Sequence, residues 1–142
     1  MNNQSDKNTA TEVWFITGAS SGFGKALTQY AVSKGYQVVA TARRKEKLEA
    51  LAATAPQQIL PIKMDVNERQ EVKNAIEQAV QHFGQIDVLI NNAGYGIVVA
   101  LEETPENELR QQMETNFFGA MSVMQEVLPH LRQQGKGAIV NM

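Results

Sequence analysis

The sequence contains no cysteine and no large excess of charge of either sign. Without cysteine the chain can form neither a disulfide nor a thiolate metal site, which fits a reducing compartment such as the cytoplasm. Lys and Arg number 13 and Asp and Glu 15, and the net charge of -2 gives no electrostatic basis for binding nucleic acid or an anionic membrane. Its two histidines, His82 and His130, are isolated in the sequence, so we expect no metal site.

Long apolar runs are also missing, since no stretch approaches the roughly 18 continuous apolar residues of a membrane-spanning helix. The amino terminus is polar and has no apolar signal-peptide region. We therefore expect residues 1–11 to be a disordered lead-in. Residues 12–142 should form one domain, because a composition of 43% hydrophobic and 20% charged residues is ordinary for a globular protein.

Short apolar runs alternate with amphipathic stretches along the rest of the chain. We expect strands at about residues 13–17, 36–42, 59–64, 86–90 and 137–142, and helices at about residues 22–34, 45–53, 72–83 and 104–134. Pro61 lacks an N–H donor and so predicts an edge position for the third strand. Thr104 should cap the last helix, with Pro105 at its first helical position.

This alternation predicts an α/β fold with a doubly wound parallel sheet, a Rossmann fold. The sheet would be incomplete on its carboxyl-terminal side, because the fifth strand of such a sheet normally has a further parallel neighbour. A bare apolar edge favours association or a partial sequence of a longer protein. A ligand would bind in the crevice at the carboxyl ends of the strands, where the strand order reverses.

A glycine-rich loop lies where the first strand passes into its helix. We expect the cofactor-binding residues of this loop to be Thr17, Gly18, Ser20, Ser21, Gly22, Phe23 and Gly24. Glycines there permit a tight turn and let helix N–H groups approach a pyrophosphate. The spacing Gly-x-x-x-Gly-x-Gly departs from the common Gly-x-Gly-x-x-Gly, and a flexible turn without a ligand is the alternative.

Two arginines, Arg43 and Arg44, follow the second predicted strand. An NAD-binding protein usually has Asp or Glu there to accept hydrogen bonds from the ribose 2'-hydroxyl. A guanidinium can instead pair with a 2'-phosphate, so the sequence favours NADP(H), with NAD(H) as the less favoured cofactor. The alternative is that both arginines are solvated charges at a helix entrance.

The glycine loop, together with Asn91-Asn92-Ala93-Gly94 after the fourth strand, resembles the short-chain dehydrogenase/reductase family over residues 12–142. Asp65-Val66 and Asn116 also match. The resemblance implies that Asp65 and Val66 contact the adenine and that Asn91, Ala93 and Gly94 line the adenosine and its ribose. Asn92 can equally serve to satisfy neighbouring backbone groups.

The resemblance also implies hydride transfer between nicotinamide and a small-molecule carbonyl or secondary alcohol, in a homo-oligomer when full length. Asn116 would belong to a catalytic tetrad whose serine, tyrosine and lysine would follow Met142. The internal match Tyr30-x-x-x-Lys34 is rejected, because Tyr30 lies roughly 9 to 12 Å along the first helix from its phosphate-facing end.

Two other functions remain open at this point. One is a non-catalytic nucleotide-binding module or an inactive fragment, which would keep the cofactor fold without the reaction. The other is a sugar-nucleotide epimerase or reductase of the extended kind, and the Asn91 to Gly94 motif argues against it.

Overall fold

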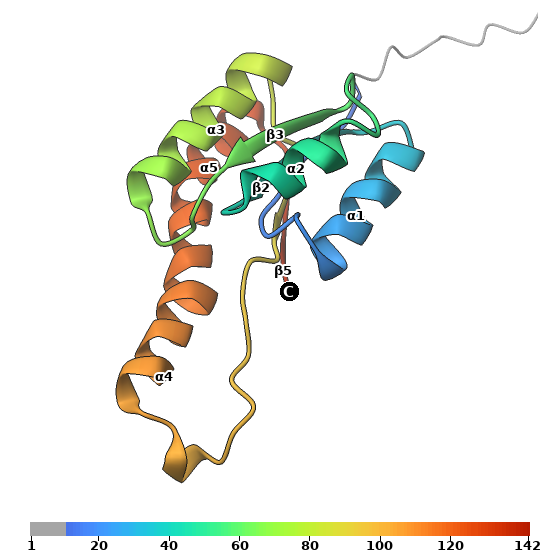
Figure 1. Ribbon diagram of the computed structural model, residues 1–142. Helices are drawn as coiled ribbons and strands as arrows, with labels where there is room; N and C mark the ends of the chain where they lie inside the picture. Colours follow the sequence, from blue (N-terminus) through green and yellow to red (C-terminus); the bar gives the residue numbers. More distant parts are fainter. Residues whose placement is uncertain (1–10) are drawn as a thin grey trace, which may run out of the picture.

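The computed structural model describes residues 11–142 (Figure 1). The predicted lead-in lies outside the described residues except for Thr11. The strands are β1 (Val13–Ile16), β2 (Gln37–Ala42), β3 (Ile59–Lys63), β4 (Val88–Asn91) and β5 (Ala138–Asn141). The helices are α1 (Gly22–Ser33), α2 (Lys45–Ala52), α3 (Arg69–Phe83), α4 (Glu106–Met113) and α5 (Ala120–Gln134), with a 3-10 turn η1 (Leu101–Glu103) and a π-helical turn η2 (Glu114–Gly119).

All five strands are parallel and follow the order β3-β2-β1-β4-β5. This order confirms the predicted doubly wound sheet, with the reversal between β1 and β4. It also puts β3 at an edge, where Pro61 pairs with Ala40 on its one neighbouring strand. The carboxyl ends of β1 and β4 therefore border the crevice in which such folds bind ligands.

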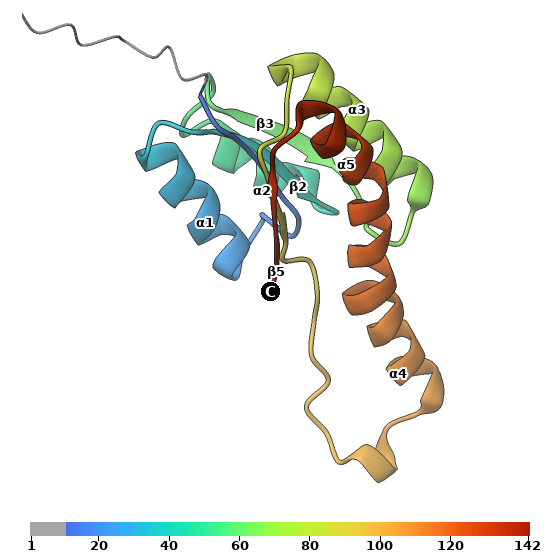
Figure 2. The same ribbon diagram turned by 180° about the vertical axis from the view of Figure 1, so that it is seen from behind.

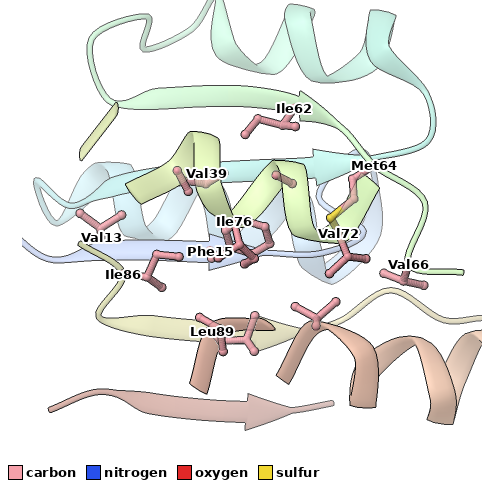
Figure 3. Close-up of a cluster of buried hydrophobic side chains, with 14 of the residues drawn as sticks. Val13, Phe15, Val39, Ile62, Met64, Val66, Val72, Ile76, Ile86 and Leu89 are labelled. Carbon is pink, nitrogen blue, oxygen red and sulfur yellow. The ribbon is translucent and has the colours of Figure 1, made fainter. Parts of the chain in front are cut away.

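Helices cover both faces of the sheet (Figures 1 and 2), and a cluster of buried apolar residues lies on each face. Phe15 of β1 points to the face covered by α3 and α5, where it packs with Ile76 and Leu89 (Figure 3). Ile16, the next residue, points to the face covered by α1 and α2 and packs with Ala31 and Leu48. Burial on both faces explains why β1 is a continuous apolar run.

The last predicted helix, residues 104–134, differs from the structure at its start and in its middle. Thr104 does not cap α4; its hydroxyl donates to the carbonyl of Ala100 at 3.0 Å, and Pro105 occupies the N-cap position. The π-helical turn η2 separates α4 from α5. Its last residue, Gly119, lies so close to the loop after β3 that a Cβ there would come within 2.6 Å of Val66 Cγ2.

The segment between β4 and η1 runs away from the sheet, and the chain returns through α4 (Figure 2). Its apolar side chains are largely exposed, with Val98 at 97%. We call residues 95–121 the arm. The methionines Met113 and Met121 are exposed on it, whereas Met124 in α5 packs against the core.

Candidate cofactor site

Thr17 ties the end of β1 to the end of β4. Its hydroxyl oxygen accepts hydrogen bonds from the backbone N–H groups of Asn92 at 3.0 Å and Ala93 at 2.9 Å. Its own N–H donates to the carbonyl of Ile90 at 3.1 Å. The side chain is 1% exposed, so its polar atoms are used inside the protein rather than presented to a ligand.

The two asparagines after β4 hold the same junction. Asn92 Nδ2 donates to the carbonyls of Thr17 at 3.0 Å and Gly18 at 3.2 Å, which is the backbone-satisfying role considered for it. Asn91 is 6% exposed, and its Nδ2 donates to Asn141 Oδ1 at 2.9 Å across β4 and β5. The first asparagine thus supports the sheet, and the second supports the glycine loop.

Two glycines of the loop are required by packing. Gly18 has a φ of 64°, in the left-handed region, and a Cβ there would lie 2.9 Å from the Cα of Ala93. At Gly24 a Cβ would collide with the carbonyl oxygen of Gly18 and lie 2.6 Å from Asn92 Nδ2. The first turn of α1 therefore packs directly on the strand ends, which places its N–H groups at the crevice.

An open cavity of about 440 Å³ lies at this crevice, within the range of about 300–1,000 Å³ typical of ligand sites. The predicted residues that line it are Gly18, Ser20, Ser21, Gly22, Phe23, Arg43, Arg44, Asp65, Val66, Ala93 and Gly94. Four predicted residues lie outside the lining: Thr17, Gly24, Asn91 and Asn116. Further lining residues that the sequence analysis did not name as cofactor-binding are Thr41, Ala42, Met64, Asn67, Asn92, Tyr95 and Thr115.

Most of the missed lining residues directly adjoin a predicted one, because the loops present consecutive residues to the cavity. Thr41 is the exception, and Thr115 adjoins the predicted Asn116 in the η2 turn. Asn67 Nδ2 donates to Thr115 Oγ1 at 2.9 Å, which joins the loop after β3 to the arm. Adjacency to Asp65-Val66 could have indicated Asn67, whereas the Thr115 contact depends on the tertiary fold.

The electrostatics of the cavity favour an anion at one end. Ser21, the N-cap of α1, makes no side-chain capping hydrogen bond, so the first N–H groups of the helix are available to a ligand. Arg43 and Arg44 are exposed at the cavity wall. Within residues 11–142 neither arginine has a carboxylate within 4.0 Å, and their charges are therefore not neutralised by an ion pair.

The wall formed by the loop after β3 is ordered by hydrogen bonds around Asp65. Its backbone N–H donates to Glu71 Oε2 at 2.8 Å, and its Oδ1 accepts the N–H of Asn67 at 2.9 Å. The adjoining Val66 is buried and belongs to the core. This wall therefore has an apolar side chain, Val66, next to the carboxylate of Asp65, which a hydrogen bond holds in place. The wall with Arg43 and Arg44 is cationic.

Asn116 clamps the backbone of the loop that follows β4. Its Oδ1 accepts the N–H of Tyr95 at 3.0 Å, and its Nδ2 donates to the carbonyl of Tyr95 at 2.7 Å. The Nε2 of Gln112 donates to the same carbonyl at 3.1 Å. Asn116 thus acts on the cavity wall through Tyr95, and Gln112, an amide one helical turn earlier, was not anticipated from the sequence.

The remaining sequence candidates lie elsewhere. Tyr30 is outside the cavity, and the Nζ of Lys34 lies 5.5 Å from the centre of its ring. Between Thr11 and Met142 no group of three or more His, Asp or Glu side chains is placed to hold a metal ion. In the same span, no helix has both the length and the apolar character needed to cross a bilayer.

The sheet order, the glycine loop and the cavity at the strand reversal define a dinucleotide-binding α/β protein. Residues 12–142 match the family model for short chain dehydrogenases, and the chain belongs to this family. It is 40% identical over 130 residues to oxidoreductase BOA17 of Botryotinia fuckeliana, and the match covers 91% of this chain and 47% of that protein.

A second relative is the 3-ketodihydrosphingosine reductase of Bacteroides thetaiotaomicron, 39% identical over 131 residues, with 92% of this chain and 46% of that protein covered. Among solved structures, a short-chain dehydrogenase from Streptomyces avermitilis superposes with a TM-score of 0.87 at 39% identity, covering 93% of this chain and 48% of that one. The chain thus spans about half the length of these relatives.

Proposed function

We propose that the protein is an NADP(H)-dependent oxidoreductase that transfers a hydride between nicotinamide and a carbonyl or secondary alcohol carbon, and that this chain is its cofactor-binding part. The observation that carries the proposal is the cavity at the β1–β4 reversal. It joins the N-terminus of α1 to two arginines that have no carboxylate within 4.0 Å among residues 11–142. An anionic dinucleotide is the ligand that this combination favours.

The residues present fit such a cofactor. Backbone N–H groups at Gly22 and Phe23 would hold the pyrophosphate, because a Cβ built at Gly22 meets nothing within 4 Å and leaves room for phosphate. Asp65 and Val66 would border the adenine. Arg43 would hold a 2'-phosphate by paired hydrogen bonds. When bound, the cofactor supplies or accepts the hydride.

We propose that Asn116 contributes to the reaction first by positioning the loop that follows β4. Its amide fixes both backbone groups of Tyr95, which lines the cavity. The family resemblance adds a proton relay with a serine, a tyrosine and a lysine, which we expect in the sequence that follows β5 in a longer protein. A proton would then move between the tyrosine and the substrate oxygen.

For the substrate we propose a ketone or the corresponding secondary alcohol, in keeping with a relative named for reduction of a 3-ketone. The absence of cysteine supports a place in the reducing cytoplasm. Exposed apolar side chains on the arm support a homo-oligomer of the full-length protein.

Deuterium transfer tests this proposal. The full-length protein is incubated with a panel of ketones and NADPH labelled with deuterium at nicotinamide C4, and the products are analysed by mass spectrometry. Deuterium at the former carbonyl carbon supports the proposal. Tight NADPH binding without transfer to any ketone would instead favour a non-catalytic nucleotide-binding module.

A further inference from the structure

A second cavity, of about 510 Å³, lies between α1 and α2 on the face of the sheet that these helices cover. Its polar lining includes Ser20, Ser21, Lys25, Lys47 and Thr54. None of the described residues that line it is acidic. A cavity with two cations and several hydroxyl groups, but no carboxylate, is suited to an anion.

The two lysines of this cavity carry free charges. Among residues 11–142, neither Lys25 nor Lys47 has a carboxylate within 4.0 Å. Lys45, in the same first turn of α2 as Lys47, is different, because its Nζ lies 3.4 Å from Glu49 Oε1 and it does not line the cavity. Of these two lysines of α2, the one that lines the cavity is therefore unpaired and the one outside the cavity is paired.

The second cavity adjoins the cofactor cavity through the glycine loop. Ser20, Ser21 and Gly22 line both, so a ligand that contacts this loop is next to both cavities. Lys25 is in the first turn of α1 and Lys47 in the first turn of α2, so both lie at the ends where these helices leave the carboxyl edge of the sheet. The positive ends of both helix dipoles are at the same edge.

A phosphate monoester brings about 1.5 to 2 negative charges at neutral pH, more than one arginine neutralises. We propose that Lys25 and Lys47, with the hydroxyls of Ser20 and Ser21, form a second basic wall for the phosphate on the cofactor ribose, in addition to Arg43. This inference rests on the proposed function. It makes both lysines specificity-determining residues for the phosphorylated cofactor.

The test compares Lys25→Gln and Lys47→Gln with Lys45→Gln, a matched control that removes the same charge from outside the cavity. Binding of NADPH, NADH, 2',5'-ADP and 5'-AMP to the purified protein is measured at two salt concentrations, with inorganic phosphate as a further ligand. Each cavity variant should bind NADPH and 2',5'-ADP about three- to tenfold more weakly. NADH and 5'-AMP should be unaffected, and the control should change NADPH binding less than twofold.

The other outcomes separate this inference from the function on which it rests. NADPH selectivity in the unmodified protein, with cavity variants that behave like Lys45→Gln, overturns the lysine wall alone. Lysine variants that weaken only inorganic phosphate overturn it too, because the anion site would then be separate from the cofactor. No selectivity in the unmodified protein overturns both. All three lysines are exposed, and thermal unfolding of each variant verifies that it folds.

Discussion

The strand ends around the glycine loop and the arm at residues 95–121 are held in different ways. At the strand ends, buried Thr17 is hydrogen bonded to Asn92, which is 75 residues away in the sequence. In the arm, Val98 is 97% and Phe118 is 55% exposed. The Asn116–Tyr95 clamp lies within the arm. The arm's contacts with the rest of the protein include the Asn67–Thr115 hydrogen bond and the close approach of Gly119 to Val66.

In the proposed enzyme, the strand ends bind the nucleotide, and the arm lies outside this rigid region. Groups facing the nucleotide are fixed by contacts within the chain, so the cofactor meets a preorganised surface that costs little ordering on binding. The arm carries apolar side chains at the surface, and the Asn67–Thr115 hydrogen bond and the packing of Gly119 on Val66 help to attach it. Substitutions at the strand ends should therefore change global stability, and substitutions in the arm should change local order.

The largest effect is expected for Gly24→Ala. Its Cβ would collide with the carbonyl oxygen of Gly18, and two backbones would have to move apart. We expect the free energy of unfolding to fall by about 3 kcal/mol, as in severe overpacking. Gly96→Ala in the arm is the matched control, because its Cβ meets nothing within 4 Å. Urea unfolding of both variants measures the difference, and equal losses would contradict the comparison.

Thr17→Val should be next. Valine keeps the shape but leaves the N–H groups of Asn92 and Ala93 without their acceptor, at a cost of about 2–3 kcal/mol. Thr17→Ser keeps the hydroxyl and should recover most of this loss. Thermal unfolding of the two variants would contradict the assignment if serine were as destabilising as valine.

Arg43→Asp addresses the cofactor rather than the fold. Loss of a charged hydrogen bond should weaken NADPH binding relative to NADH binding by about 1–3 kcal/mol. Arg43 is exposed, so thermal unfolding should be nearly unchanged. Fluorescence titration with each cofactor gives the selectivity, and an equal effect on both would remove the case for a 2'-phosphate site.

Asn116→Leu should have the smallest effect on stability, below about 1 kcal/mol, because Asn116 is exposed and its bonds are local. Its effect should appear as faster amide hydrogen exchange at Tyr95, whose N–H loses its acceptor and whose carbonyl loses one of its two donors. Gln112→Leu removes one of the two donors to the Tyr95 carbonyl and should accelerate exchange less. Unchanged exchange at Tyr95 in Asn116→Leu would show that the clamp does not order this loop.

The fold could be predicted from the sequence because each buried strand is a short apolar run and α1, α3 and α5 have glycine at or just after their ends. Gly84, with a φ of 83°, is the C-cap of α3, as expected. The π-helical turn was not predicted, because its extra residue leaves the composition and the apolar spacing of a long helix almost unchanged. Its close contact with Val66 is set by tertiary packing.

The sequence motifs predicted which residues lie near the cavity. They predicted the lining correctly only where the position in the motif also determines which way the side chain points. Arg43 and Gly18 line the cavity as the strand ends suggest. Asn91 is at the end of β4 as well, yet its side chain points to Asn141 on the neighbouring strand. Successive strand residues face opposite sides, so one residue of uncertainty in where a strand ends changes which side chain meets the ligand.

The most direct test of the account is titration of the purified protein with NADPH and with NADH, following the fluorescence of each cofactor. The account predicts saturable binding of both, with NADPH bound at least about tenfold more tightly because of its ribose phosphate. Equal affinity, tighter binding of NADH, or no saturable binding of NADPH would contradict the assignment of Arg43 and of the cavity beside it.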